Sequence, residues 1–320
     1  MFARTRDAYQ LGGSILFLGV QDVVGSRADV EKILLDGGFS FDASVPTSSA
    51  PAESRRHKEF AHISGIKDPA PMDEVLRMLG FSSVDSMDAF ENEDPTILHD
   101  LNRPVPNELH ERFDVVADNG GLEHVCDIRA AIENVVRMVK VGGAVVLYNP
   151  MVGEHNQCLF NLQPAFFFDV FSANGFDDLK MYLHFFPRYG QFDFGKSSWQ
   201  EYRYGDETTF QKRFANTNSF FVAKKTRPTG EFVVPMQRYY VDYHTNDGET
   251  PVPSPVQSDE PDDDRPWVLD QIPSVVRPLY PLLAPAYRMM PNWVRCCVLD
   301  GVLKPLRYRR ELADRERFRL

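Results

Sequence analysis

The sequence has little of several features that mark particular classes of protein. Only four of its 320 residues are cysteines, and they form no Cys-x-x-Cys pair. This argues against a zinc knuckle or a dithiol redox motif and indicates a reduced, cytoplasmic setting. No uninterrupted apolar run reaches ~18 residues, so we expect no transmembrane helix. Residues 1–10 are charged rather than apolar, unlike a signal peptide.

Positive charge is also in short supply, since the formal net charge is −11 at pH 7. Binding to nucleic-acid phosphates requires a basic surface, so we expect no broad nucleic-acid interface. Hydrophobic residues make up 43% of the chain, which allows a sizeable core and excludes wholesale disorder. The length allows one large or two modest domains, and the oligomeric state stays open.

Glycine is scarce where a nucleotide-binding loop would need it. Residues 14–18 form a predicted strand followed by Gly19, but the next glycine is Gly25. Neither a GxGxxG nor a GxGxG pattern is present, which argues against a dinucleotide-binding dehydrogenase. Gly19 itself would let a ligand approach the backbone closely, and a plain strand-to-loop turn is the alternative.

The clearest pattern in the sequence runs over residues 113–150. Apolar runs at 113–117 and 144–148 predict two buried strands. Asp127 stands where a helix N-cap belongs, and Gly142 and Gly143 are expected to close that helix. Its buried face is marked by Ile128, Ala131, Ile132, Val135, Val136 and Val139. Strand, crossover helix and strand form a βαβ unit of a doubly wound α/β sheet.

Ligands of doubly wound sheets bind beyond the carboxyl ends of the strands, which here are residues 118–124 and 149–155. The same patterns predict further helices and strands in the chain. The helices are at 29–38, 72–79 and 165–173, and the strands at 82–84, 96–98, 180–186 and 218–224.

The composition changes near residue 226. We expect residues 1–225 to form one domain, residues 226–265 an acidic, proline-rich linker, and residues 266–320 an apolar extension with a basic end. That extension either packs as a helical appendage or contacts an anionic membrane surface or a partner protein. The loop 39–71, with basic residues at 55–58, is either a substrate lid or a solvated loop.

Motifs around the predicted central unit resemble a known family. The motifs are Leu122-Glu123-His124 after the fourth strand, and a Lys-x-Gly-Gly turn that ends at Gly143 and is followed by Asn149-Pro150. In this combination they resemble the class I S-adenosylmethionine-dependent methyltransferases. Two further motifs resemble a bacterial subset of that family. One is a degenerate Leu-Gly-x-Gln first motif, here Leu18 to Gln21, and the other is a third-strand motif, here His99-Asp100-Leu101-Asn102.

The resemblance implies the architecture and the cofactor. The fold would be a doubly wound, Rossmann-like, seven-stranded sheet, mostly parallel with an antiparallel last strand, with helices on both faces and a C-terminal extension. The cofactor would be S-adenosylmethionine. The aromatic-rich stretch 187–214 between the last two strands would wall the acceptor pocket or cover the sheet edge.

The resemblance also implies which residues hold the cofactor. Gly19 and Gln21 would lie at its methionine end, with Asn119 in the loop after the fourth strand. A carboxylate that ends the second strand suits the two ribose hydroxyls; Asp85 is the better candidate by position and Asp88 the alternate, although an ordinary acidic turn would look similar. Asp100 would accept from the adenine amino group and the Leu101 N–H would meet a ring nitrogen. Alternatively, Asp100 caps the next turn.

Two histidines are candidates for proton removal from an acceptor. His124 and His155 both lie in the expected edge loops, and histidine titrates near neutrality. Glu123 is a further candidate base, a structural residue that bonds across the loop, or a helix cap. No metal site is predicted, because Asp118, Glu123, His124 and His155 lack a recognisable ligand spacing.

The predicted function is a cytoplasmic S-adenosylmethionine-dependent methyltransferase. It would transfer a methyl group to oxygen or nitrogen of a small-molecule or glycan-type acceptor. The alternative is a catalytically inactive protein of the same fold that acts as a binding or interaction module, which the missing GxGxG pattern and the long extension favour.

Overall fold

The computed structural model describes residues 1–21, 23, 25–47, 70–153, 158–186, 197–204 and 216–245. Most of the loop 39–71 with its basic cluster, His155, much of the stretch 187–214 and the extension 266–320 lie outside these described residues. The predictions made for those parts therefore stay predictions.

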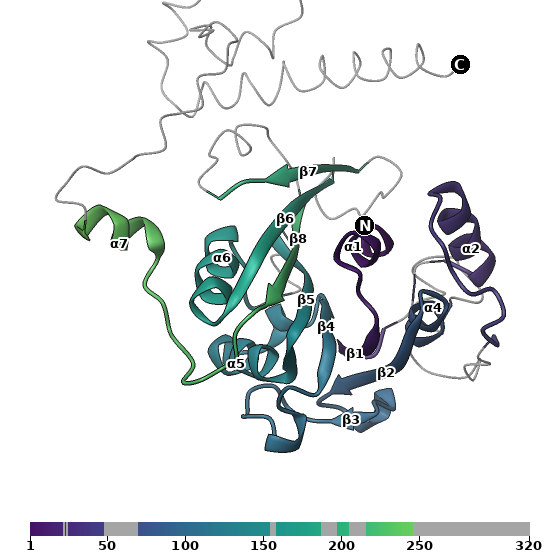
Figure 1. Cartoon of the computed structure of the whole chain (residues 1–320), viewed down its shortest axis with the longest axis horizontal. Helices are drawn as coiled ribbons and strands as arrows, with labels where there is room; N and C mark the ends of the chain where they lie inside the picture. The colour runs from purple at the N-terminus through teal and green to yellow at the C-terminus, as the bar shows by residue number, and fades with distance from the viewer. Residues whose placement is uncertain are drawn as a thin grey trace, which may run out of the picture. The chain divides into compact units, whose positions relative to one another are not determined.

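The described residues build one eight-stranded sheet with the order β3-β2-β1-β4-β5-β8-β6-β7 (Figure 1). The strands are β1 Gly13–Leu18, β2 Phe81–Asp88, β3 Ile97–Leu98, β4 Phe113–Asn119, β5 Val139–Val152, β6 Phe176–Phe186, β7 Ser198–Tyr202 and β8 Asn216–Lys225. The pairs from β3 to β5 are parallel, whereas β8 is antiparallel to both β5 and β6. The expected mixed α/β architecture is confirmed, with β7 as an additional antiparallel edge strand within the stretch 187–214.

Helices cover both faces of the sheet. α1 Phe2–Tyr9, α2 Arg27–Asp36 and α4 Met72–Met78 pack on one face through a core that includes Ile15 and Phe17. α5 Ile128–Met138 and α6 Pro164–Ala173 pack on the other. Three short 3-10 helices, η1 Glu91–Glu93, η2 Asn107–Leu109 and η3 Leu122–His124, and the helix α7 Arg238–Thr245 complete the described part.

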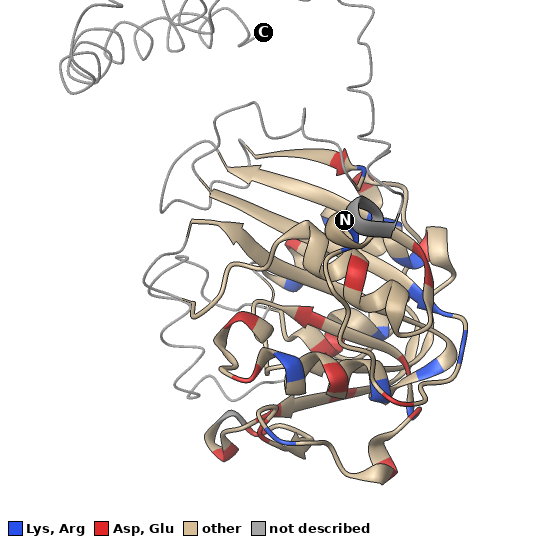
Figure 2. Cartoon of the chain, turned by 90° about the vertical axis from the view of Figure 1, so that its left-hand side faces the viewer, with Lys and Arg blue, Asp and Glu red and all other residues tan. Residues whose placement is uncertain are grey.

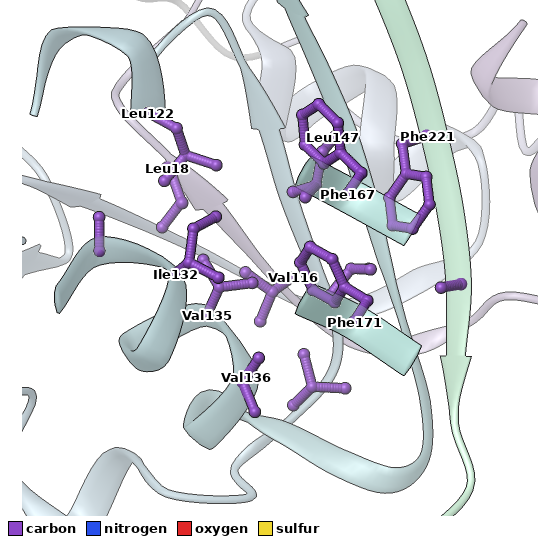
Figure 3. Packing of buried hydrophobic residues seen from close by; sticks show 14 of the residues in the cluster. Leu18, Val116, Leu122, Ile132, Val135, Val136, Leu147, Phe167, Phe171 and Phe221 are labelled. Carbon is purple, nitrogen blue, oxygen red and sulfur yellow. The ribbon is translucent and has the colours of Figure 1, made fainter. Parts of the chain in front are cut away.

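The larger core lies between the sheet and the pair α5 and α6 (Figure 3). Phe167 and Phe171 of α6 both meet Phe221 of β8, each with ring centroids 5.2 Å apart. The buried α5 face is the one that the apolar periodicity predicted, because side chains three and four residues apart share one side of a helix. This packing holds β4 and β5 in place, and with them the loops at their carboxyl ends.

The helix α5 begins as expected and ends earlier than expected. The Asp127 carboxylate accepts a hydrogen bond from the Ala130 N–H, as an N-cap does. The expectation that Gly142 and Gly143 close the helix is wrong, since both lie inside β5. Gly142 has a φ of 86°, and a Cβ at Gly143 would lie 2.6 Å from the Asp114 carbonyl oxygen, so the pair allows an irregular stretch of β5 to pass close to β4.

A buried lysine caps the end of α5 instead. The Nζ of Lys225, which is fully buried, donates to the carbonyl oxygens of Val136 and Val139 at 2.9 and 2.7 Å. These carbonyls are among those that a helix C-terminus leaves without intrahelical partners. The cation therefore stabilises the helix end both by hydrogen bonds and by its charge.

The chain after β8 packs back on the domain before α7. The N–H of Val233 donates to the Asn174 side chain at 2.8 Å, and the N–H of Arg238 donates to Asp169 at 3.0 Å. Phe232 is buried in the larger core. The first part of the segment expected to be a linker is thus in contact with α6.

Charged side chains are spread over the described surface. Basic and acidic residues alternate over the side shown in Figure 2, and the basic residues in that view do not gather into one patch. Within the described ranges, no helix combines the length and the apolar character that a membrane span requires.

Candidate functional site

The strand order reverses between β1 and β4, and polar residues follow both strands. In open α/β sheets this is where ligands bind, outside the carboxyl ends of the strands. Gly19, the first residue after β1, has a φ of 78° and donates its N–H to the Met87 carbonyl at 2.7 Å. The nearest heavy atom to a Cβ placed there would be Nε2 of Gln21, at 3.6 Å. Gly19 thus allows a backbone conformation that other residues rarely adopt.

Gln21 and Asn119 join the ends of β1 and β4. The Gln21 Nε2 donates to the Asn119 carbonyl oxygen at 2.8 Å, and the Asn119 Nδ2 donates to the Gln21 Oε1 at 2.9 Å. Both residues are half-buried. The structure therefore brings together Gly19, Gln21 and Asn119, three residues that the sequence analysis selected separately.

The second strand is longer than expected, which changes the position of its carboxylates. Asp85 pairs with Leu16 in the body of β2, so the expectation that it stands at the strand end is wrong. Asp88 is the last residue of β2, and its Oδ1 accepts from the Phe90 N–H at 3.0 Å. Phe90 is 67% exposed and offers an open aromatic face beside that carboxylate.

The ends of β2 and β3 lie side by side. The His99 N–H donates to the Asp88 carbonyl at 2.9 Å. Asp100 directly follows His99 in the chain, so this bond brings Asp88 and Asp100 close together. The Oδ1 of Asp100 accepts from both the N–H and the Nδ2 of Asn102, at 2.9 and 2.8 Å, so Asp100 does cap a turn. These two bonds hold the pKa of Asp100 below its usual value. Leu101 is packed against the larger core.

A pair of buried carboxyl groups lies beneath the loop that follows β4. Asp118 and Glu123 are each 2% exposed. The Nδ2 of Asn149, on β5, donates to Asp118 Oδ2 and, at 2.9 Å, to Glu123 Oε2. Asp118 also accepts from the N–H groups of Gly121 and Leu122, at 3.1 and 3.3 Å.

Burial sets the protonation of this pair. Desolvation, followed by the nearby Glu123 carboxylate, raises the pKa of Asp118, and desolvation raises the pKa of Glu123. Two carboxylates that converge on one amide nitrogen in a buried place repel each other when both are ionised, so the folded pair keeps one proton up to a higher pH than free carboxyl groups do. Glu123 is therefore a structural residue that bonds across the loop, one of the three roles the sequence left open.

The candidate bases are separated from this pair. His124 is exposed on η3, while Glu123 beside it is buried. His155 lies outside the described residues. Within the described ranges, no group of three or more His, Cys, Asp or Glu side chains is arranged to hold a metal ion.

Tyr148 and His184 near this edge were not selected from the sequence, whereas Trp199 belongs to the aromatic stretch 187–214 that was. The Tyr148 hydroxyl lies 2.8 Å from Nδ1 of His184, and the imidazole stacks on Trp199 with centroids 3.8 Å apart. Four consecutive polar residues, 216–219, are buried at the start of β8. A run of polar residues leading into an apolar strand was visible in the sequence, but their burial depends on which strands flank β8.

Comparisons with known proteins give a likeness of fold. No protein-family model matches the chain, and no curated protein matches it. A S-adenosylmethionine-dependent methyltransferase from Thermotoga maritima is 13% identical, with 70% of this chain and 86% of that chain covered and a TM-score of 0.34. Another from Archaeoglobus fulgidus is also 13% identical, with 70% and 92% covered and a TM-score of 0.36. Likeness at this level assigns no activity.

Proposed function

We propose that this chain is a S-adenosylmethionine-dependent methyltransferase that methylates oxygen or nitrogen of a small-molecule or sugar-type acceptor. The observation that carries the proposal is the meeting of Gly19, Asn119 and Asp88 at the edge where the strand order reverses. A flexible backbone position, amide groups and a carboxylate on adjacent strand ends suit a ligand with a charged amino acid end and a ribose.

The residues present fit the cofactor group by group. The backbone at Gly19 would lie against the methionine end, and Gln21 and Asn119 offer side-chain amides there. Asp88 would accept from the ribose hydroxyls, which need an acceptor, and Phe90 would stack on the adenine ring. Asp88 thus replaces Asp85 as the better candidate in this proposal. The Asp100 carboxylate and the Leu101 N–H remain the proposed contacts to the adenine edge.

When bound, the cofactor would supply an activated methyl group on a sulfonium. The protein would have to align the acceptor with that methyl and exclude water, and for a hydroxyl or amine acceptor remove a proton. His124, which is exposed on η3, and His155 stay the proposed bases.

Calorimetric titration with S-adenosylhomocysteine tests the cofactor assignment. We expect saturable binding to the full chain, weakened by Asp88→Asn and unaffected by Asp85→Asn, which removes a carboxylate from the body of the same strand. No heat of binding at millimolar ligand, with a circular dichroism spectrum that shows a folded protein, would reject the proposal.

One observation favours the second candidate, a binding module without activity. The Gln21 side chain donates to the Asn119 backbone carbonyl and accepts from the Asn119 side chain, and Asp100 accepts from Asn102, so these groups are already engaged. If these hydrogen bonds never open, neither the wild type nor Gln21→Ala binds S-adenosylhomocysteine. If cofactor binding exchanges the Gln21 bonds, the same variant changes a measurable affinity.

A further inference from the structure

A row of polar and aromatic side chains crosses the antiparallel half of the sheet. Pro150 of β5, Asn218 of β8, His184 of β6 and Trp199 of β7 are successive partners in the strand register. Residues directly opposed on neighbouring antiparallel strands point to the same face. Tyr182 and Phe220, two residues along β6 and β8 from this row, pack in the core on the α1, α2 and α4 side, so the row lies on that face.

His184 is enclosed by rings. Its Nδ1 lies 2.8 Å from the Tyr148 hydroxyl, and the Phe186 ring centroid is 4.2 Å away. The indole of Trp199 lies nearly parallel to the imidazole, at a centroid distance of 3.8 Å and an interplanar angle of 11°. Burial, followed by the positive charge of the N-terminal amino group, lowers the pKa of His184 to about 4. At neutral pH its flat face is therefore an uncharged stacking surface.

Asn218, next to His184 in the row, has an unsatisfied oxygen. The residue is 5% exposed, and within the described part of the chain its Oδ1 accepts no hydrogen bond. A buried carboxamide oxygen without a donor is costly and calls for an explanation. The apolar carbon face of an indole stacked on the adjacent imidazole supplies no such donor.

Trp199 is the most exposed member of the row. It is 40% exposed and lies on the edge strand β7, whereas His184 beneath it is 2% exposed. In the described part of the chain its other ring contacts are looser, with the centroid of Tyr148 at 6.3 Å in a tilted arrangement and that of Phe220 at 6.2 Å in an edge-on one. An exposed side chain on an edge strand can change rotamer without disturbing a core.

We propose that Trp199 occupies the place of a planar ligand ring, and that an uncharged ring with an O–H or N–H donor displaces it. The ring would stack on His184 and donate its hydrogen bond to Asn218 Oδ1, with Tyr148 at its border. A charged ring is disfavoured, because the side chains of Asn218, His184 and Tyr148 carry no charge to offset the desolvation of an ionised group in this buried row.

The place of this row gives the ring a role, which rests on the proposed function. Tyr148 pairs with Asn119 across β4 and β5, and its carbonyl accepts the Gly120 N–H at 2.9 Å. Tyr148, which contacts His184 of the row, thus lies beside the residues proposed to hold the cofactor. The displacing ring would be the methyl acceptor, a hydroxylated or amino-substituted aromatic compound rather than a sugar.

Tryptophan fluorescence tests the displacement directly. The chain has three tryptophans, so Trp267→Phe with Trp293→Phe leaves Trp199 as the only tryptophan in the full-length protein. Catechol, an uncharged ring with donors, is the probe. Veratrole has the same ring without donors, benzoate carries a charge, and methyl glucoside has hydroxyls without a planar ring. We expect catechol alone to shift the Trp199 emission to the red, with saturation, and the others to bind at least ~tenfold more weakly.

Two variants then examine the contacts by calorimetry. Asn218→Leu removes the acceptor at similar volume and should weaken catechol about tenfold while leaving veratrole unchanged. Trp199→Ala removes the competing ring and should tighten catechol several-fold, and this exposed edge position is safe for folding. Glu201→Gln, an exposed change on the same strand, is the control.

Any of three results overturns the inference. They are an unchanged emission with catechol, tighter binding of benzoate or methyl glucoside than of catechol, and equal catechol affinity in Trp199→Ala and the unchanged protein. Catechol is titrated without cofactor, so this result is separate from the S-adenosylhomocysteine titration. If S-adenosylhomocysteine fails to bind and catechol binds, the ring site stands without the methyltransferase; the reverse result rejects the ring site alone.

Discussion

Two pairs of acidic residues lie at the same edge of the sheet and have opposite environments. Asp88 ends β2 and Asp100 follows β3 by two residues, and both are partly exposed and accept from N–H groups of their own turns. Asp118 and Glu123 are buried and converge on Asn149. The first pair is accessible to a ligand, whereas the second keeps a proton up to a higher pH than free carboxyl groups do and holds the loop after β4. A carboxylate near the end of a strand is thus a candidate for ligand binding only where the neighbouring loops and helices leave it accessible.

Removal of the shared amide should have the largest effect. Asn149→Leu leaves two buried carboxyl groups without their common donor, and we expect it to lower the free energy of unfolding by about 3 kcal/mol. Urea denaturation measures the loss. Asn119→Leu removes a half-buried amide on the adjacent strand and should cost about 1 kcal/mol. Equal losses in the two variants would show that burial of the carboxyl pair has no special cost.

The buried pair should also make stability depend on pH. Its pKa is raised in the folded state, so the folded protein holds a proton that the unfolded chain releases above about pH 4. Stability from this source is therefore full at low pH and falls as the pH rises toward the folded pKa, by up to about 1.4 kcal/mol per pH unit. Denaturation of wild type and Asp118→Asn at several pH values measures it. The difference should shift in favour of Asp118→Asn as the pH rises; a constant difference contradicts the shared proton.

The exposed pair should respond in ligand affinity instead. Asp88→Asn should weaken S-adenosylhomocysteine about tenfold, because a carboxylate accepts more strongly than an amide from a hydroxyl. The free energy of unfolding should hardly change, since the side chain is partly exposed at the end of β2. Calorimetry and urea denaturation on the same sample separate the two quantities. Loss of stability without loss of affinity would show that Asp88, like the buried pair, has a structural role and does not bind the ligand.

The smallest change is expected at Asp100. Asparagine can form the same turn with Asn102, so Asp100→Asn should alter the free energy of unfolding by less than about 0.5 kcal/mol at neutral pH. Its depressed pKa means that any stabilisation by the charge is present above the unfolded pKa and lost as the pH falls toward the folded one. A weaker S-adenosylhomocysteine affinity in this variant would sharpen the comparison, since it would place Asp100 at the ligand despite its turn.

Local patterns in the sequence predicted the secondary structure well and some boundaries poorly. The Asp127 N-cap and the buried face of α5 follow from chemistry within one helical turn. The two glycines after α5 looked like a helix end, because the close passage of β5 beside Asp114 involves a strand that is distant in sequence. Asp85 was misplaced because the length of β2 depends on its partner β1, with which it pairs as far as Met87.

The sequence by itself determined the alternation of helices and strands, the turn at Gly19 and the acidic residues near the strand ends, because these depend on propensity and on side chains a few residues apart. Only the tertiary structure decided which carboxylates are buried and that Asn149 serves two of them. It also decided that Asn218, His184 and Trp199 form one row. Burial and strand register depend on contacts between strands that are far apart in the chain, and a local sequence pattern does not encode those contacts.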